Sequence, residues 1–216
     1  MKLERLYDPD NKLNRFCDLV VGVFLTGLFT FICSLPIITM STALTAGYYT
    51  TAKVVRHHEG YVWTEYFKSF RRNFKTSFGI GFFYLLAAAI VVFDTLYLKN
   101  NTEELSDVMI FIIIAVGVMI AVTFFFVCFE LSRFDKRGFQ IFKFGVVTAF
   151  RHFPSAFAIA AMFALAGLFV YKMPWGFALW PGFALYGSTF LMERVMRKYM
   201  PVPEEGSPEA DKWYYK

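Results

Sequence analysis

The sequences FCDLVVGVFLTGLFTFICSLPII, at residues 16–38, and MSTALTAGYYTTAKVV, at residues 40–55, decide the fold of this chain. The first stretch is apolar and long enough to cross a bilayer as a helix, which takes about 20 residues. The second is more polar and rich in small residues, and as a helix it would reach only ~24 Å. The direction in which this second segment runs decides how often the chain crosses the membrane.

Four further stretches are apolar over a comparable length: residues 76–98, 107–131, 155–171 and 175–192. Of all 216 residues, 57% are hydrophobic, 28 are Phe and only 18% are charged, against roughly 25% charged residues in soluble domains. A soluble chain of this length could not bury so much apolar surface, so lipid is the expected solvent for most of it. This composition excludes an ordinary cytosolic enzyme, a disordered protein and a disulfide-stapled secreted domain.

The distribution of Lys and Arg decides between five and six crossings. Basic residues gather in the amino-terminal arm, between the second and third stretches, between the fourth and fifth, and at the carboxyl end. If residues 40–55 return to the starting side, Lys99 and Lys172 are the only two of the 22 basic residues outside, as expected when cytoplasmic loops carry the Lys and Arg. With a single crossing before Lys53, one of the first two basic groups would lie on the wrong side. We therefore expect six crossings, or five and a re-entrant segment, with both termini cytoplasmic.

The expected fold class is an all-α integral membrane protein. It is a bundle of five to six transmembrane helices, with interfacial amphipathic helices on the cytoplasmic side. Residues 1–200 form a single transmembrane helical domain in this prediction. The Pro- and acid-rich residues 201–216 form a flexible cytoplasmic tail.

A helix-turn and packing motif is expected where the first two segments meet. Pro36 lacks an N–H donor and disfavours helix in the residue before it, so we expect a break at Ser34-Leu35-Pro36. Small residues after the break would let neighbouring helices approach closely. The candidate residues of this motif are Ser34, Pro36, Thr39, Ala43, Ala46 and Gly47.

A basic, aromatic helix is expected just before the third apolar stretch. Aromatic residues recur there at spacings of 4, 3 and 4, and basic residues occupy the other side of the helical wheel. Such a helix lies in the headgroup plane with its cations toward anionic lipid; alternatively, its aromatic face packs on the cytoplasmic end of the bundle. The candidate membrane-surface contacts are Trp63, Phe67, Lys68, Phe70, Arg71, Arg72, Phe74 and Lys75.

A similar pattern occurs later in the chain. Residues 70–78, FRRNFKTSF, are similar to residues 150–157, FRHFPSAF, with one residue deleted, and each pattern leads into an apolar stretch. The similarity indicates a repeated unit of interfacial helix and hairpin, or it arises by chance in a sequence so rich in Phe.

Motifs that carry chemistry are missing from the sequence. It contains no phosphate-binding loop, GxSxG, HExxH or kinase signature. His57 and His58 are adjacent, whereas two metal-binding His on one helix stand four residues apart, and the three Cys show no metal-binding spacing. We therefore expect no catalytic residue, no cofactor and no metal. We also expect no nucleic-acid partner, because the basic residues flank apolar spans.

Four carboxylates beside the apolar stretches have interfacial positions in this prediction: Asp18, Asp94, Glu130 and Glu193. Glu130 makes a workable helical pair with Arg133, three residues later. No acidic relay crosses the middle of a span, as a proton- or sodium-coupled transporter would be expected to show.

One part of the chain resembles a known family. The run Ser34-Leu35-Pro36-Ile37-Ile38-Thr39, then Ala43, Ala46 and Tyr48-Tyr49, and later Glu59-Gly60, Phe67, Phe70 and Arg72-Asn73-Phe74-Lys75 resemble the YesL family of bacterial membrane proteins. Those proteins share a SLPIxTxGxxxxAxYY turn followed by FxxFxxNFK; here Met40-Ser41 replaces the usual small residue and Gly. The resemblance implies a domain of unknown function in a bacterial plasma membrane, often encoded near carbohydrate-uptake and polysaccharide-degradation genes. It carries no catalytic residue to this chain.

The expected function is that of a non-enzymatic accessory of a bacterial carbohydrate-uptake system, by the resemblance alone. Its expected partners are the lipid bilayer and a sugar transporter subunit, and its oligomeric state is left open. The alternative is a small transporter or channel whose path lies beside residues 40–55. An intramembrane enzyme ranks third, because no pair of nucleophile and base is visible.

Overall fold

The computed structural model describes residues 12–101, 107–134 and 139–200, and all regular elements in these ranges are helical. The α-helices in chain order are α1 (Lys12–Ser34), α2 (Met40–Thr50), α3 (Val62–Asn101), α4 (Asp107–Leu131), α5 (Phe139–Arg151), α6 (Phe153–Lys172) and α7 (Leu179–Met196). Two 3-10 helices, η1 (Ile37–Thr39) and η3 (Pro174–Gly176), and a π-helix, η2 (Thr51–Arg56), connect some of them. The described residues therefore have the expected all-α class.

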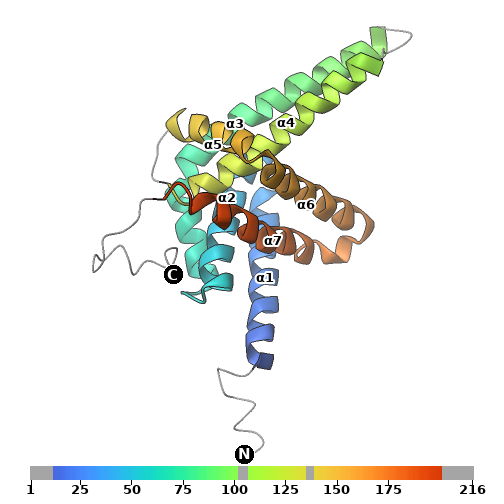
Figure 1. The fold of residues 1–216 in the computed structure, drawn as a ribbon. Coiled ribbons are helices and arrows are strands. Elements are labelled where there is room, and N and C mark those ends of the chain that lie inside the picture. Colours follow the sequence, from blue (N-terminus) through green and yellow to red (C-terminus); the bar gives the residue numbers. More distant parts are fainter. Residues whose placement is uncertain (1–11, 102–106, 135–138, 201–216) are drawn as a thin grey trace, which may run out of the picture.

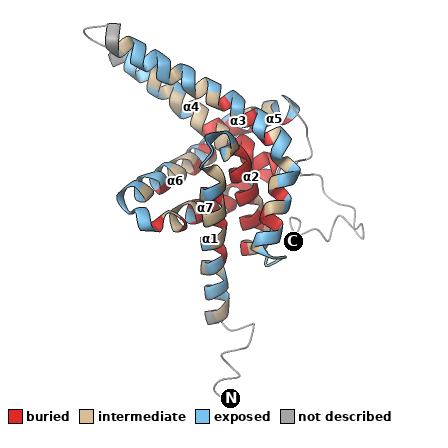
Figure 2. Cartoon of the chain, turned by 180° about the vertical axis from the view of Figure 1, so that it is seen from behind, coloured by how far each residue is buried: buried red, intermediate tan, exposed pale blue. Residues whose placement is uncertain are grey.

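Helix α2 lies at the centre of the molecule, and the chain runs back along α1 to form it (Figure 1). The backbone at Gly22 of α1 faces Val55, and Gly47 of α2 faces Thr30 of α1. These two pairs are antiparallel, so η2 ends beside the first half of α1. Figure 2 shows α2 almost entirely buried between its neighbours.

Helix α3 then runs antiparallel to α2. The Ser41 hydroxyl at the start of α2 donates to the Ser77 carbonyl at 2.6 Å, while Lys53 of η2 lies 3.0 Å from Glu65, near the start of α3. The return of residues 40–55 along α1 is thus a feature of the fold. Whether this segment crosses the bilayer stays a prediction.

The helices spread outward from a common centre. Three arms leave the region of α2 in different directions: the amino-terminal part of α1, the pair α3 and α4, and the pair α6 and α7 (Figure 1). Helix α3, with 40 residues, is about 60 Å long, whereas α2, with 11, is about 17 Å long. Because the core forms around so short a helix, the longer helices extend beyond it.

Four helical segments are long and apolar enough to cross a membrane: Asn14–Ser34, Val62–Leu98, Val108–Leu131 and Phe153–Lys172. They overlap the expected spans at 16–38, 76–98, 107–131 and 155–171. No more than 28% of the residues in the most apolar part of any of them is buried within the protein. These helices are compatible with insertion into lipid, and the number of crossings stays a prediction for α2 and α7.

The boundary expected between a surface helix and a span at residues 75 and 76 is not a helix break. Helix α3 continues from Val62 to Asn101, and no proline lies within it. In the similar stretch at residues 150–157, by contrast, α5 ends at Arg151 and α6 begins at Phe153, with Pro154 in its first turn. The two similar stretches therefore have different backbone structures, which weakens the case for a structural repeat.

The expected break after the first apolar stretch lies where α1 ends. Helix α1 stops at Ser34, and the Thr39 hydroxyl of η1 donates to the carbonyls of Cys33 (2.7 Å) and Pro36 (2.9 Å). These hydrogen bonds close the turn that starts α2. The last expected span, at residues 175–192, corresponds to η3 followed by α7.

Candidate functional site

The most enclosed region of the described structure surrounds α2. All residues from Ser41 to Tyr48 are buried, and Ala43 and Ala46 have no exposed surface. A Cβ atom at Gly47 would overlap the Thr30 hydroxyl and lie 2.9 Å from Leu185 of α7. Of the motif expected from the sequence, Ala43, Ala46 and Gly47 thus lie in this packed region, while Ser34, Pro36 and Thr39 lie at the break before it.

Hydroxyl groups of α2 connect it to α3 and α4. The Thr45 hydroxyl lies within hydrogen-bond distance of the Ser41 carbonyl (2.8 Å) and of the Cys128 carbonyl on α4 (3.0 Å). The Ser77 hydroxyl of α3 donates to the Thr45 oxygen at 3.4 Å. In a lipid-exposed protein such contacts satisfy polar groups that neither water nor lipid would satisfy.

A buried ion pair lies where the carboxyl-terminal ends of α2, α4 and α7 meet. Arg133, just after α4, pairs with Glu193 of α7, and the two side chains are only 2% and 4% exposed. The Tyr48 hydroxyl of α2 donates to Oε1 of Glu193 at 3.4 Å. Glu130, one turn before Arg133, is 1% exposed. We call these four residues (Tyr48, Glu130, Arg133 and Glu193) the ion-pair cluster.

Two further guanidinium groups lie at the edge of the ion-pair cluster. Arg56 of η2 donates to the Thr189 carbonyl at 3.2 Å, and its guanidinium carbon lies 4.8 Å from the centre of the Phe190 ring. Arg72 of α3 donates to the Ser132 carbonyl at 3.4 Å. Charged groups therefore join η2 and the first third of α3 to α7 and to the end of α4.

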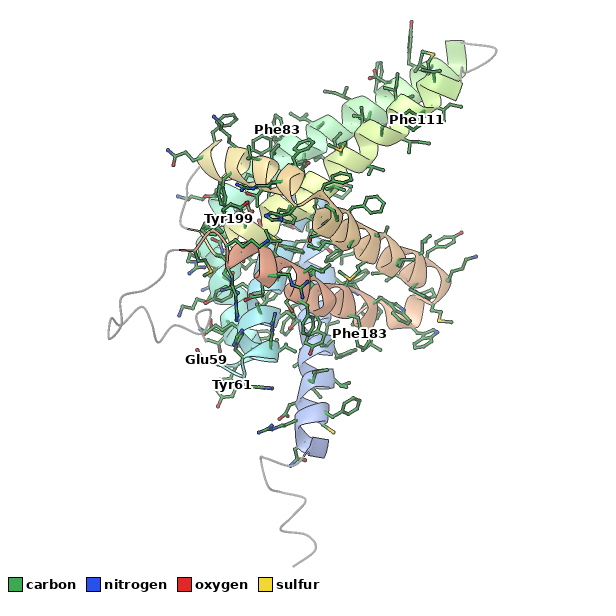
Figure 3. All side chains as sticks on the ribbon, viewed as in Figure 1. Glu59, Tyr61, Phe83, Phe111, Phe183 and Tyr199 are labelled. Carbon is green, nitrogen blue, oxygen red and sulfur yellow. The ribbon has the colours of Figure 1, made fainter. Side chains whose placement is uncertain are left out.

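The charge around the cluster acts on the nearby histidine. Burial lowers the pKa of His57 below its ordinary value, and the positive charges of Arg56, Arg133 and Arg197 lower it further. A second histidine, His152, lies between α5 and α6. Its Nε2 atom is 3.2 Å from the hydroxyl of Tyr199, which Figure 3 labels. These histidines have neighbours that oppose their protonation.

Sequence reasoning did not find the ion-pair cluster. The sequence paired Arg133 with Glu130 and placed Glu193 at an interface, whereas the structure joins Arg133 to Glu193, 60 residues away. The one available signal was a carboxylate at the end of an apolar stretch with Tyr and Thr nearby. Such a pattern indicates that the carboxylate is buried and paired, but it does not identify the residue with which the carboxylate pairs.

Part of the aromatic side of α3 packs on α1. The ring centre of Phe29 of α1 lies 5.2 Å from that of Trp63, 5.6 Å from Tyr66 and 5.7 Å from Phe67. Farther along α3, Phe70 and Phe74 contact each other at 5.7 Å. Trp63 nevertheless remains 63% exposed, so both the packing and the lipid-surface interpretations of this aromatic face stay predictions.

The basic side of α3 is divided between protein contacts and open surface. Lys68, Arg71 and Lys75 are exposed, as is Phe74. The guanidinium of Arg72 is 5.3 Å from the centre of the Tyr49 ring. Contact of the exposed residues with lipid stays a prediction.

A surface pocket of about 540 Å³ lies between α1 and the turn from η2 to α3, with Asp18, His58 and Trp63 in its wall. The backbone of that turn is left-handed at His58 (φ 55°) and Gly60 (φ 90°). Within the described ranges, no three side chains of His, Cys, Asp or Glu gather to form a metal site.

Comparison with known proteins finds one similarity. Residues 21–95 match the family described as "Protein of unknown function, DUF624". No curated protein and no solved structure matches the chain. The matched part covers most of α1, all of α2 and most of α3. This part of the chain is thus similar to an uncharacterised domain family.

Proposed function

We propose that the chain is a non-enzymatic, multi-pass protein of a bacterial plasma membrane that acts by contact with another membrane protein. The observation that supports this mode of action is the close packing around α2. Its buried residues meet α1, α3, α4 and α7, and Gly47 has no room for a side chain. A protein with a packed interior and long apolar outer surfaces is suited to work through those surfaces.

The proposed partner is a subunit of a carbohydrate-uptake system. The choice of this partner rests on the resemblance of residues 34–75 to the YesL family alone. It does not rest on any sugar-binding group among the described residues. In this proposal both termini are cytoplasmic, as the distribution of Lys and Arg favours.

The partner is tested by photocrosslinking in native membranes. A photoreactive residue is placed at Phe111, which is 72% exposed on the outer part of α4 (Figure 3). A control variant carries it at Phe126 of the same helix, which is fully buried. We expect the Phe111 variant to give adducts with a sugar permease, and the Phe126 variant to give none. Adducts with lipid alone, or equal adducts from both variants, would contradict the proposal.

A transporter or channel is the second candidate, and one observation favours it. The helix beside the expected path changes from α to π at Thr51, and π-helical turns occur often at functional sites. For transport, the contacts of Gly47 with Thr30 and Leu185 would have to open. Flux of a sugar into liposomes that contain this protein alone would support transport and contradict the accessory role.

A further inference from the structure

A groove of about 470 Å³ runs along the outside of the molecule between α3 and α5. The α3 side is formed by Lys75, Gly79, Ile80 and Phe83, and the α5 side by Phe139 and Phe142. The rings of Phe83 and Phe142 meet edge to face at 5.1 Å, and Phe139 stacks on Phe142 at 5.9 Å. The floor of the groove is therefore built from side chains that hold one another in place.

The groove is charged at one end and apolar along the rest. Among the described residues that line it, only Lys75 carries a charge, and this side chain is exposed. Phe83 and Phe139 remain 55% and 75% exposed although they line the groove. Along the axis of α3, Lys75 and Phe83 are separated by about 12 Å, at 1.5 Å per residue. An occupant that matches both ends is an amphiphile with an anionic head and an apolar tail.

The backbone of α3 leaves room for such an occupant. A Cβ atom at Gly79 would meet nothing within 4 Å, so the surface midway between Lys75 and Phe83 is open. Lys75 also stands where the sequence places the cytoplasmic end of the span at residues 76–98. This is the depth at which a lipid phosphate lies and from which an acyl chain extends along the span.

We propose that this groove binds one anionic phospholipid, with its phosphate at Lys75 and an acyl chain against Phe83, Phe139 and Phe142. A lipid of this kind would join α3 to α5 through contacts that a zwitterionic lipid makes less well, because the zwitterionic headgroup has no net charge to pair with Lys75. The site is independent of the proposed partner protein.

The test uses the full chain in detergent micelles with equal amounts of phosphatidylglycerol and phosphatidylcholine, read out by native mass spectrometry. Two variants address the site: Gly79→Leu fills the groove, and Lys75→Gln removes its charge. Each has a matched control. Gly117→Leu introduces the same side chain on α4, where a Cβ atom also meets nothing within 4 Å. Lys172→Gln removes an exposed charge at the end of α6, away from the groove.

We expect the unmodified chain to retain one phosphatidylglycerol in preference to phosphatidylcholine. Lys75→Gln should weaken that preference about fivefold, the factor for one Lys near an anionic lipid surface. Gly79→Leu should abolish retention, while Gly117→Leu and Lys172→Gln should behave like the unmodified chain. Equal retention of both lipids, retention unaffected by Gly79→Leu, or equal loss in the Gly117→Leu control would overturn the proposal. Protein dimers in place of the lipid adduct would also overturn it, because a second copy would then occupy the groove.

Discussion

Helices α2 and α4 show opposite relations between hydropathy and burial. Helix α2 has only 11 residues and carries hydroxyl groups at Ser41, Thr42 and Thr45, yet it is buried from Ser41 to Tyr48. Helix α4 is strongly apolar, yet Val108 and Phe111 on its outer half are 64% and 72% exposed. In a soluble protein this relation would be reversed. Because lipid tails are as apolar as Leu, the interior of a membrane protein is selected for small size and for hydrogen bonds.

The same contrast exists within α4 itself. Its first half carries exposed Val, Ile and Phe, whereas Phe126, Val127 and Phe129 near its end are fully buried. The buried end lies against α2 and leads into the ion-pair cluster. Position relative to α2 therefore decides burial, and apolar character by itself does not.

The largest expected effect is the presence or absence of Cys labelling. It tests whether α2 crosses the membrane, as α4 is expected to do. Single Cys residues at Lys2, Gly60, Gly138 and Ser207 should resist a membrane-impermeant thiol reagent in intact cells, and one at Asn101 should be labelled, because residues 40–55 return the chain to the starting side. The reagent applied after permeabilisation provides the control. Labelling at Gly60 together with protection at Lys2 would show that the segment does not return.

The next largest effect concerns the ion-pair cluster, which lies at the carboxyl-terminal ends of α2 and α4. Arg133→Leu should lower the free energy of unfolding in detergent by about 3–5 kcal/mol, because Glu193 is left buried without its ion-pair partner. Adding Glu193→Leu should cost less than the sum of the two single changes, since the unpaired charge is then removed. Additive losses in denaturant unfolding would mean that the two residues are not coupled.

A matched pair of glycine changes compares the helices directly. Gly47→Leu in α2 should destabilise the protein by about 1–3 kcal/mol, because its Cβ atom already overlaps Thr30. Gly117→Leu in α4 should cause no loss and can gain up to about 1 kcal/mol, because Gly is a poor helix former and the site is open. Thermal unfolding in the same detergent measures both. Equal losses would contradict the contrast between α2 and α4.

The smallest effect is a dependence of stability on pH at the charged end of the molecule. Folding lowers the pKa of His57 from its ordinary 6.5, so the unfolded chain binds more protons between the lowered value and 6.5. The free energy of unfolding should therefore fall as the pH drops below 6.5, and His57→Gln should reduce this slope. His152, whose pKa is lowered by burial and then by Lys198 and Arg151, contributes in the same direction.

A double variant separates this effect from a general one. The double variant of His57 and His152 should lose more of the slope than His57→Gln alone. A slope that is unchanged in the double variant of His57 and His152 would assign the pH dependence to other groups.

Several features of this protein follow from the sequence alone. The all-α class follows from apolar stretches long enough to cross a bilayer, and the end of α1 at Ser34 follows from Pro36, which acts only on its own neighbours. The small residues in the segment 40–55 predict close helix packing, and Ala43, Ala46 and Gly47 are buried in the structure. These inferences succeed because length, hydropathy and proline geometry are local properties.

Other features were decided by the tertiary structure. The sequence separates residues 63–75 from the following span by charge, but the backbone has no reason to break there, and α3 is continuous. Phe29 of α1 contacts the rings of Trp63 and Phe67, and no spacing within α3 predicts this contact. Tyr48 and Glu193 stand 145 residues apart and meet only because α2 and α7 end at the same place. The periodicity of a helix predicts which of its residues share a face. Which other helix packs on that face depends on how all the helices pack together.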